Sequence, residues 1–470
     1  MRWILFLLDK RIFLGVFVCV CVMLVPLNGH KSQANAEEIP LSLNDCLDLA
    51  LKHNPDIESS RTFKNETESK LSQAKSAQYP EINAGAKAGY ISEMNRITQK
   101  DATVVLPGPS TATIPGREME LGAHEQTDLF LSLTQPIYTG GRIKSGIRMA
   151  EAGFGVASHQ ISLEENRIRN EVTTLFYQLA QSMENKKVAM ISRDQIERHL
   201  KDTKNLVDQG MLLQSDIYPI NIRRLDIELM IIKAENAISR TKAALAERLG
   251  FPPEKEIEIA VDWDTTPPWP IPEALMEKNE KRHEQRIAEQ QIEAASAEIE
   301  IAKGALKPEI GFIASGHYGY PGFNSTDPEW DKWWQAGINV SYPLFDMSKK
   351  KYGEKAAVLQ KARLEKGKES LDHKISLDQI NARLTYEEAC RNMCITREKV
   401  LTAEENYRLK NDNFKVGMAT NTDFLDAHAE LVKAQSERVL VSAEMRIAWS
   451  EFLRAMGKED WMDKEKEKTE

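Results

Sequence analysis

The chain has 470 residues, of which 28% are charged and 41% are hydrophobic, and its formal net charge is −9. Lysine and arginine are dispersed along this acidic chain, which argues against a nucleic-acid-binding protein. The cysteines beyond residue 36 are Cys46, Cys390 and Cys394, an odd number that lacks the spacing of a disulfide framework. We expect Cys390 and Cys394 to be small buried residues rather than a redox pair or a metal site, because no second ligand pair accompanies them.

Residues 1–36 have the features of a secretory signal peptide. Lys10 and Arg11 precede an apolar run from Ile12 to Leu27, and small and polar residues follow it, ending in the A-x-A site Ala34-Asn35-Ala36. The alternative is an uncleaved anchor, but the run is shorter than the roughly 18 to 20 residues of a membrane-spanning helix. We therefore expect cleavage after Ala36.

The rest of the chain is an internal duplication. An offset of 207 residues separates the matching landmarks Pro136 and Pro343, Gly210 and Gly417, Asp216 and Asp423, and Gly250 and Gly457. Matching landmarks at a constant offset indicate two structurally equivalent halves within one fold. We expect a first repeat at 37–250, a Pro-rich linker at 251–272, a second repeat at 273–457 and a charged tail at 458–470.

Each repeat is expected to contain a long helical hairpin, at 142–250 and at 347–457. From Ile143 to Leu179 the apolar residues recur by alternating fours and threes, and the same 3.5-residue period continues along Ile222, Leu225, Leu229 and Ile232. Two such helices should supercoil around each other. Because no proline interrupts 142–210, a helix there would be roughly 100 Å long, at 1.5 Å per residue.

Four short segments alternate apolar and polar residues, which predicts β-strands at about 80–92, 127–138, 308–319 and 333–344. Each is about ten residues long, the length of a tilted strand that crosses a bilayer. Residues 91–127 and 319–332 are expected to be loops outside the membrane. Aromatic residues gather at both strand ends, as in the girdles of a membrane barrel: Tyr79, Tyr138, Tyr342 and Phe345 at one end, and Tyr90, Tyr318, Tyr320, Trp333 and Trp334 at the other. The alternative is an ordinary sheet in a soluble protein.

Four strands cannot close a barrel, and a sheet edge exposed to lipid leaves backbone groups unsatisfied. Two chains would give eight strands, whose interior is filled by side chains, whereas three chains give twelve strands around a water-filled lumen. A polar inner face of Gln335, Asn339 and Ser341 favours the trimer. The predicted fold class is therefore mostly α with a membrane β-barrel: a trimeric twelve-strand barrel continued by an α-barrel of helical hairpins.

Three segments carry a resemblance to a known family: residues 41–56 (LSLNDCLDLALKHNPD), 135–142 (QPIYTGGR) and 414–423 (FKVGMATNTD). On these segments the chain resembles the TolC-like outer-membrane efflux proteins. The resemblance implies a homotrimer in outer-membrane lipid, with a periplasmic helical barrel and the linker 251–272 near an equatorial belt. It implies passive export, driven by an inner-membrane pump of the RND or ABC type through a periplasmic adaptor. The resemblance does not identify the exported substrate, so drug efflux, metal efflux and type I protein secretion are all compatible with it.

The resemblance also implies functional residues at the hairpin tips. Gly210, Met211, Leu212, Gly417 and Met418 would dock an adaptor, although glycines there are also explained by helix ends in the left-handed conformation. Asp423 and Asp426 would form a cation-attracting ring at the entrance, with pKa values raised by mutual repulsion. The alternative is that both are N-terminal helix carboxylates favoured by the helix dipole.

A gate region is implied at Asp216, Phe414 and Ala419. The family pattern has an Asp, a Tyr and an Arg at these places, but Phe414 has no hydroxyl group and Ala419 has no charge. We therefore expect the entrance to be held shut more by packing than by salt bridges.

No enzymatic motif is present, and no catalytic, cofactor or metal site is expected. The histidines are scattered singly, and we expect residues such as His199 and His428 to lie on helix surfaces. The alternative function is a periplasmic coiled-coil structural or adaptor protein without a membrane barrel.

Overall fold

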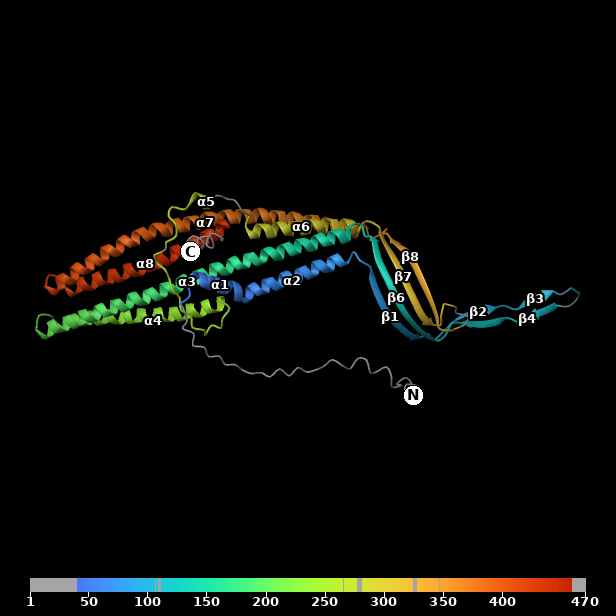
Figure 1. Ribbon diagram of the computed structural model, residues 1–470, viewed down its shortest axis with the longest axis horizontal. Coiled ribbons are helices and arrows are strands. Elements are labelled where there is room, and N and C mark those ends of the chain that lie inside the picture. Colours follow the sequence, from blue (N-terminus) through green and yellow to red (C-terminus); the bar gives the residue numbers. More distant parts are fainter. Residues whose placement is uncertain are drawn as a thin grey trace, which may run out of the picture. The chain divides into compact units, whose positions relative to one another are not determined.

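The computed structural model describes residues 40–105, 107–108, 111–264, 266–276, 281–323, 328–345 and 347–458 (Figure 1). The expected signal peptide at 1–36 lies outside these residues, as does all but the first residue of the charged tail at 458–470.

Two helices of unusual length dominate the described chain, with 67 residues in α3 and 69 in α7. At 1.5 Å per residue, α3 is about 100 Å long. The helices are α1 (Leu43–His53), α2 (Pro55–Ser76), α3 (Arg142–Asp208), α4 (Ile217–Arg248), α5 (Glu273–Met276), α6 (His283–Gly304), α7 (Met347–Lys415) and α8 (Asn421–Met456). No helix among the described residues combines the length and the apolar character needed to cross a membrane.

The helices pack as two similar groups. α4 folds back along α3, and α8 folds back along α7, while the shorter α2 and α6 lie beside α3 and α7 (Figure 1). α3 also packs on α6 and α8, which joins the two groups. Local sequence explains where the first helices begin, because Ser42 and Asp45 form a capping box at α1 and Pro55 occupies the first turn of α2.

A hydrophobic core lies where α1, α3, α4 and the linker meet. Cys46, Phe176 and Leu245 are buried there together with Ile259 of the linker. Leu41 pairs with Ile259 in a short parallel bridge, which fixes the start of the described chain against the linker. A second core forms around Tyr386, Trp449 and Phe452, and the hydroxyl group of Tyr386 donates to the carbonyl of Pro268 at 2.8 Å.

The cysteine prediction was wrong in part. Cys46 and Cys390 are buried, but Cys394 is exposed.

The main sheet has four antiparallel strands in the order β1-β6-β7-β8: β1 (Glu81–Tyr90), β6 (Glu125–Tyr138), β7 (Glu309–Tyr320) and β8 (Asp331–Ser341). Their ends differ from the expected ones by three residues at most. Within the described chain β1 and β8 each have a single neighbouring strand, so both edges of the sheet are open.

The register separates the sheet into a polar face and an apolar face. Asn83, Ser132, Ser315 and Gln335 pair in one row of the polar face. Leu131, Gly316 and Trp334 pair in one row of the apolar face, where Tyr90, Tyr318 and Tyr320 also lie.

The expected aromatic girdle needs a correction at Trp333. Its register partner is His317 on the polar face, and the two rings are stacked with centroids 5.1 Å apart. Successive residues of a strand point to opposite faces, so Trp334 lies on the apolar face with Tyr318 and Tyr320, and Trp333 does not.

Residues 91–127, expected to form a loop, contain four additional short strands. β2 (Asn95–Gln99) pairs with β5 (Arg117–Leu121), and β3 (Ala102–Val105) pairs with β4 (Thr111–Ile114). Cross-strand pairs such as Ile97 with Met119 and the ion pair of Arg96 with Glu120 favour an extended hairpin over an irregular loop.

Candidate functional site at the hairpin tips

Both helical hairpins reverse direction through the same backbone motif. Gly210 and Gly417 adopt left-handed conformations, with φ angles of 74° and 76°. The following N–H groups donate back into the helix, from Met211 to Leu206 at 2.9 Å and from Met418 to Asn413 at 2.8 Å. This Schellman arrangement requires glycine for a local reason, whatever else the tips do.

The tips expose apolar side chains. Met211 is 68% exposed and Met418 is 82% exposed. Leu212, which the sequence suggested as a docking residue, is half-buried, whereas its neighbour Leu213 is 71% exposed. Leu213 is therefore the leucine that the first tip presents to solvent.

Among the described residues, Asp216 contacts the second hairpin through its main chain and not through its carboxylate. The carboxylate accepts the N–H of Leu213 at 3.0 Å, within its own turn. The carbonyl oxygen of Asp216 accepts a hydrogen bond of 2.8 Å from the side-chain amide of Asn421, the first residue of α8. Sequence reasoning missed Asn421, although its place just after the helix cap could have identified it as a tip residue.

Asp423 caps its own helix. It accepts hydrogen bonds from the hydroxyl group of Thr420 at 2.7 Å and from the N–H of Thr420 at 3.0 Å, and Lys410 of α7 donates to it at 3.0 Å. The Thr420 hydroxyl, the Thr420 N–H and Lys410 hold the pKa of Asp423 well below its ordinary value.

We expected repulsion between aspartates to raise the pKa of Asp423. Within one chain, its hydrogen bonds with Thr420 and Lys410 lower this pKa instead. This arrangement fits the alternative of an N-terminal helix carboxylate. Asp426, which lies one turn further along α8, is exposed.

The prediction that His199 and His428 lie on helix surfaces was wrong. His199 of α3 is 4% exposed and His428 of α8 is fully buried. The ring of Phe424 lies nearly parallel to both imidazoles, at 14° to His199 and 10° to His428. We call these three residues the histidine stack.

Hydrogen bonds join α3 to α8 at both ends of the histidine stack. Nε2 of His199 donates to the side-chain oxygen of Asn421 at 2.7 Å, and the hydroxyl group of Ser192 is 3.1 Å from Nε2 of His428. Among the described residues, Nδ1 of His428 has no hydrogen-bond partner. Phe414 is buried beside the stack, with its ring centroid 4.6 Å from that of His199, and Ala419 is half-buried.

Burial lowers the pKa values of both histidines, because the charged form loses its hydration. The pKa of His428 falls to about 4, with Arg223 and His199 as further causes. The hydrogen bond that His199 donates to the side-chain oxygen of Asn421 and the charge of Asp202 oppose the effect of burial on the pKa of His199. Helical spacing could have shown this cluster, since Ile196, His199 and Thr203 share one buried face of α3.

Comparisons with known proteins agree with this architecture. The sequence model of the outer membrane efflux protein family matches residues 46–250 and 276–458. The toluene efflux pump outer membrane protein TtgC of Pseudomonas putida is 26% identical over 185 residues. The antibiotic efflux pump outer membrane protein ArpC of Pseudomonas putida matches equally well. Each alignment covers 38% of this chain and 37% of the relative, so the chain matches little more than a third of each protein's length.

Solved structures share the fold over most of the chain. The outer-membrane channel OprN has a TM-score of 0.73 at 16% identity, with 88% of this chain and 90% of OprN covered. The outer membrane protein VceC from Vibrio cholerae has a TM-score of 0.72 at 16% identity, with coverages of 88% and 96%. CusC has a TM-score of 0.73 at 13% identity, with coverages of 90% and 94%.

Proposed function

Because the chain belongs to the outer membrane efflux protein family, we propose that it forms a trimeric outer-membrane channel for the export of small molecules. The observation that carries this proposal is the four-stranded sheet, which has both edges open and one polar and one apolar face. Open edges in lipid leave N–H and C=O groups without partners, so the sheet must be completed by other copies of the chain.

Three copies fit this sheet better than two. An eight-strand barrel is filled by its own side chains, whereas twelve strands leave room for water. The polar face with Asn83, Ser132 and Gln335 suits a wet lumen, and the apolar face with Leu131 and Trp334 suits lipid.

The helices support association as well. Ile222, Leu225, Leu229 and Ile232 were expected to pack on α3, but they are 50% to 62% exposed. The residues of α4 buried within the hairpin include Ile220 and Ile227 instead. An apolar stripe of this length is unfavourable in water, so we assign it to a neighbouring copy in a helical barrel.

A periplasmic adaptor would cover the apolar tips. Met211, Leu213 and Met418 are exposed at the reversals, where an adaptor could bury them. The pump beyond the adaptor would be of the RND or ABC type. The names of the curated relatives concern toluene and antibiotics, which favours small organic molecules over proteins as cargo.

Substitutions in the α4 stripe test the proposal. The wild-type chain purified from outer membranes should run as a heat-modifiable trimer in detergent and conduct ions in planar bilayers. The double substitution Leu225→Asp and Leu229→Asp should give monomers without conductance, because six carboxylates would enter the contacts between copies. The double substitution Leu225→Met and Leu229→Met keeps the stripe apolar, is the matched control and should stay trimeric. A wild-type chain that is monomeric and does not conduct would contradict the proposal.

A further inference from the structure

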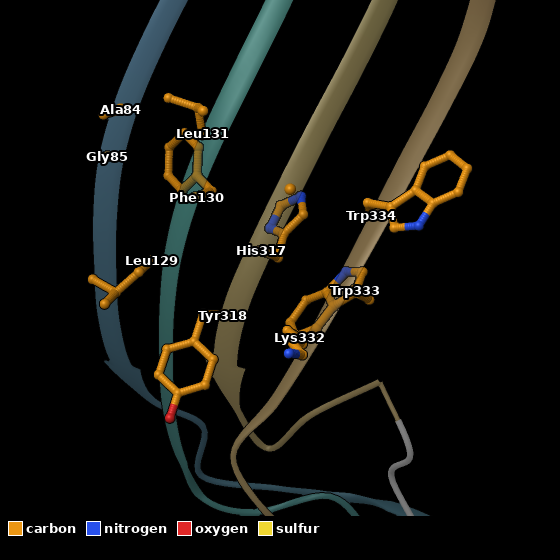
Figure 2. Close-up of a pocket in the computed structure, with 11 residues that line it drawn as sticks. Ala84, Gly85, Leu129, Phe130, Leu131, His317, Tyr318, Lys332, Trp333 and Trp334 are labelled. Carbon is orange, nitrogen blue, oxygen red and sulfur yellow. The ribbon is translucent and has the colours of Figure 1, made fainter.

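The apolar face of the sheet contains a hollow of about 740 Å³ (Figure 2). Its floor includes Gly316 of β7, and side chains from β6, β7 and β8 form its walls. Leu129, Leu131, Tyr318 and Trp334 are the large apolar-face side chains that line it, and the lining also includes Phe130, His317 and Trp333, whose register places them on the polar face. All of these residues lie within the sheet of one chain, so the hollow does not depend on a neighbouring copy.

The hollow exists because residue 316 has no side chain. A Cβ atom at Gly316 would meet no other atom within 4 Å, and its φ angle does not require glycine. On either side of it, Leu131 is 56% exposed and Trp334 is 79% exposed. Trp334 therefore forms an aromatic wall and Leu131 an aliphatic wall of the open apolar hollow, on the face that we assign to lipid.

On the apolar face, the charged and hydroxyl-bearing residues of the lining, Lys332 and Tyr318, lie at one end of the hollow, whereas His317 belongs to the polar face. Lys332 is the register partner of Tyr318, and both lie one row closer to the 319–332 loop than Gly316 does. Trp330 stacks on Tyr318, with the ring centroids 5.1 Å apart. Asp331 belongs to the opposite face, so this end combines an ammonium group with a phenolic hydroxyl.

We propose that this hollow binds lipopolysaccharide, with an acyl chain over Gly316 and a lipid A phosphate at Lys332 and the hydroxyl group of Tyr318. Ammonium and hydroxyl groups donate strong hydrogen bonds to phosphate oxygens, and basic residues at a membrane surface recognise anionic headgroups. The inference rests on the proposed function, because a channel whose helices extend into the periplasm has the opposite ends of β7 and β8, and hence Lys332, at the outer leaflet.

The test measures lipopolysaccharide bound to the trimer. Delipidated trimers are incubated with phosphatidylethanolamine nanodiscs that contain purified lipopolysaccharide, and the bound molecules are counted by native mass spectrometry. Lys332→Ala should weaken binding about fivefold, the change that corresponds to about 1 kcal/mol for one basic residue near an anionic surface. Gly316→Leu fills the hollow and should weaken binding at least as much.

Matched controls lie on the polar face of the same sheet. A Cβ atom at Gly337 of β8 would likewise meet no other atom within 4 Å, and Lys87 of β1 lies over the ring of Phe130. Gly337→Leu and Lys87→Ala should leave lipopolysaccharide binding unchanged, because neither residue faces lipid.

Three results would overturn the inference. If Lys332→Ala and Gly316→Leu bind lipopolysaccharide like the wild type while the trimers still conduct, the site is wrong and the proposed function stands. If phosphatidylglycerol binds as tightly as lipopolysaccharide, the assigned occupant is wrong. If the wild-type chain forms neither trimers nor channels, the proposed function and this inference both fail.

Discussion

The imidazole of His199 stacks on the ring of Phe424, with the ring centroids 3.6 Å apart and the planes 14° from parallel. His199 belongs to the first hairpin and Phe424 to the second, so this contact joins the two halves of the duplication near the tips. The hydrogen bonds of Asn421 and Ser192 join the same two helices on either side of it.

Truncating Phe424 should therefore loosen the tips. Phe424 is 1% exposed, and Phe424→Ala should destabilise the contact between hairpins by about 3 to 5 kcal/mol, as for other buried phenylalanines. Thermal unfolding of the purified trimer measures the loss. Phe63→Ala, at a position 43% exposed, should cost much less. Equal losses in the two variants would argue against a special role for the stack.

The histidine stack should weaken in acid. The pKa of His428 is about 4 in the folded chain and 6.5 ordinarily, so between these values the opened state binds more protons. Stability is then complete above about pH 6.5 and falls as the pH drops toward 4, by up to about 3 kcal/mol. Hydrogen exchange at the start of α8 should speed up over this range, and His428→Gln should remove most of the pH dependence. The same pH dependence in both proteins would exclude His428 as its source.

Periodicity in the sequence was enough to predict the long helices and the four main strands, because both patterns are local. Periodicity does not show which helix, or which copy of the chain, packs against a given apolar stripe. α4 has two such faces, one with Ile220 and Ile227 and one with Leu225 and Leu229, and only packing shows which of them faces α3. The same limit applies to His199, whose burial depends on a residue of α8 more than two hundred positions away.

The exposed tip residues should matter for transport and not for assembly. Met211→Asp, Leu213→Asp and Met418→Asp place charge on surfaces that are already exposed, so trimers should persist while export fails. Drug accumulation in cells that carry the native adaptor and pump measures export. Ser215→Asp adds the same charge to an exposed polar position of the first tip and should have little effect. Full export by all three tip variants would remove the docking proposal.

The two entrance aspartates should differ in their effects. The carboxylate of Asp426 is exposed, and three copies would bring three such charges to one opening, so Asp426→Ala should weaken cation selectivity in planar bilayers. The carboxylate of Asp423 accepts hydrogen bonds from Thr420 and Lys410. Asp423→Ala should therefore mainly destabilise the first turn of α8. Reversal potentials in a salt gradient separate the two variants, and an equal loss of selectivity would show that Asp423 also faces the pore.

The gate prediction now concerns Asn421 more than Asp216. The side chain of Asn421 accepts from His199 and donates to the carbonyl of Asp216, so Asn421→Ala removes two contacts between the hairpins. It should raise the conductance of the resting channel. Asp216→Ala leaves that carbonyl in place and removes a carboxylate that bonds only within its own turn in the described contacts, so conductance should change little. A large rise from Asp216→Ala, with none from Asn421→Ala, would show that a carboxylate contact absent from the single chain holds the entrance shut.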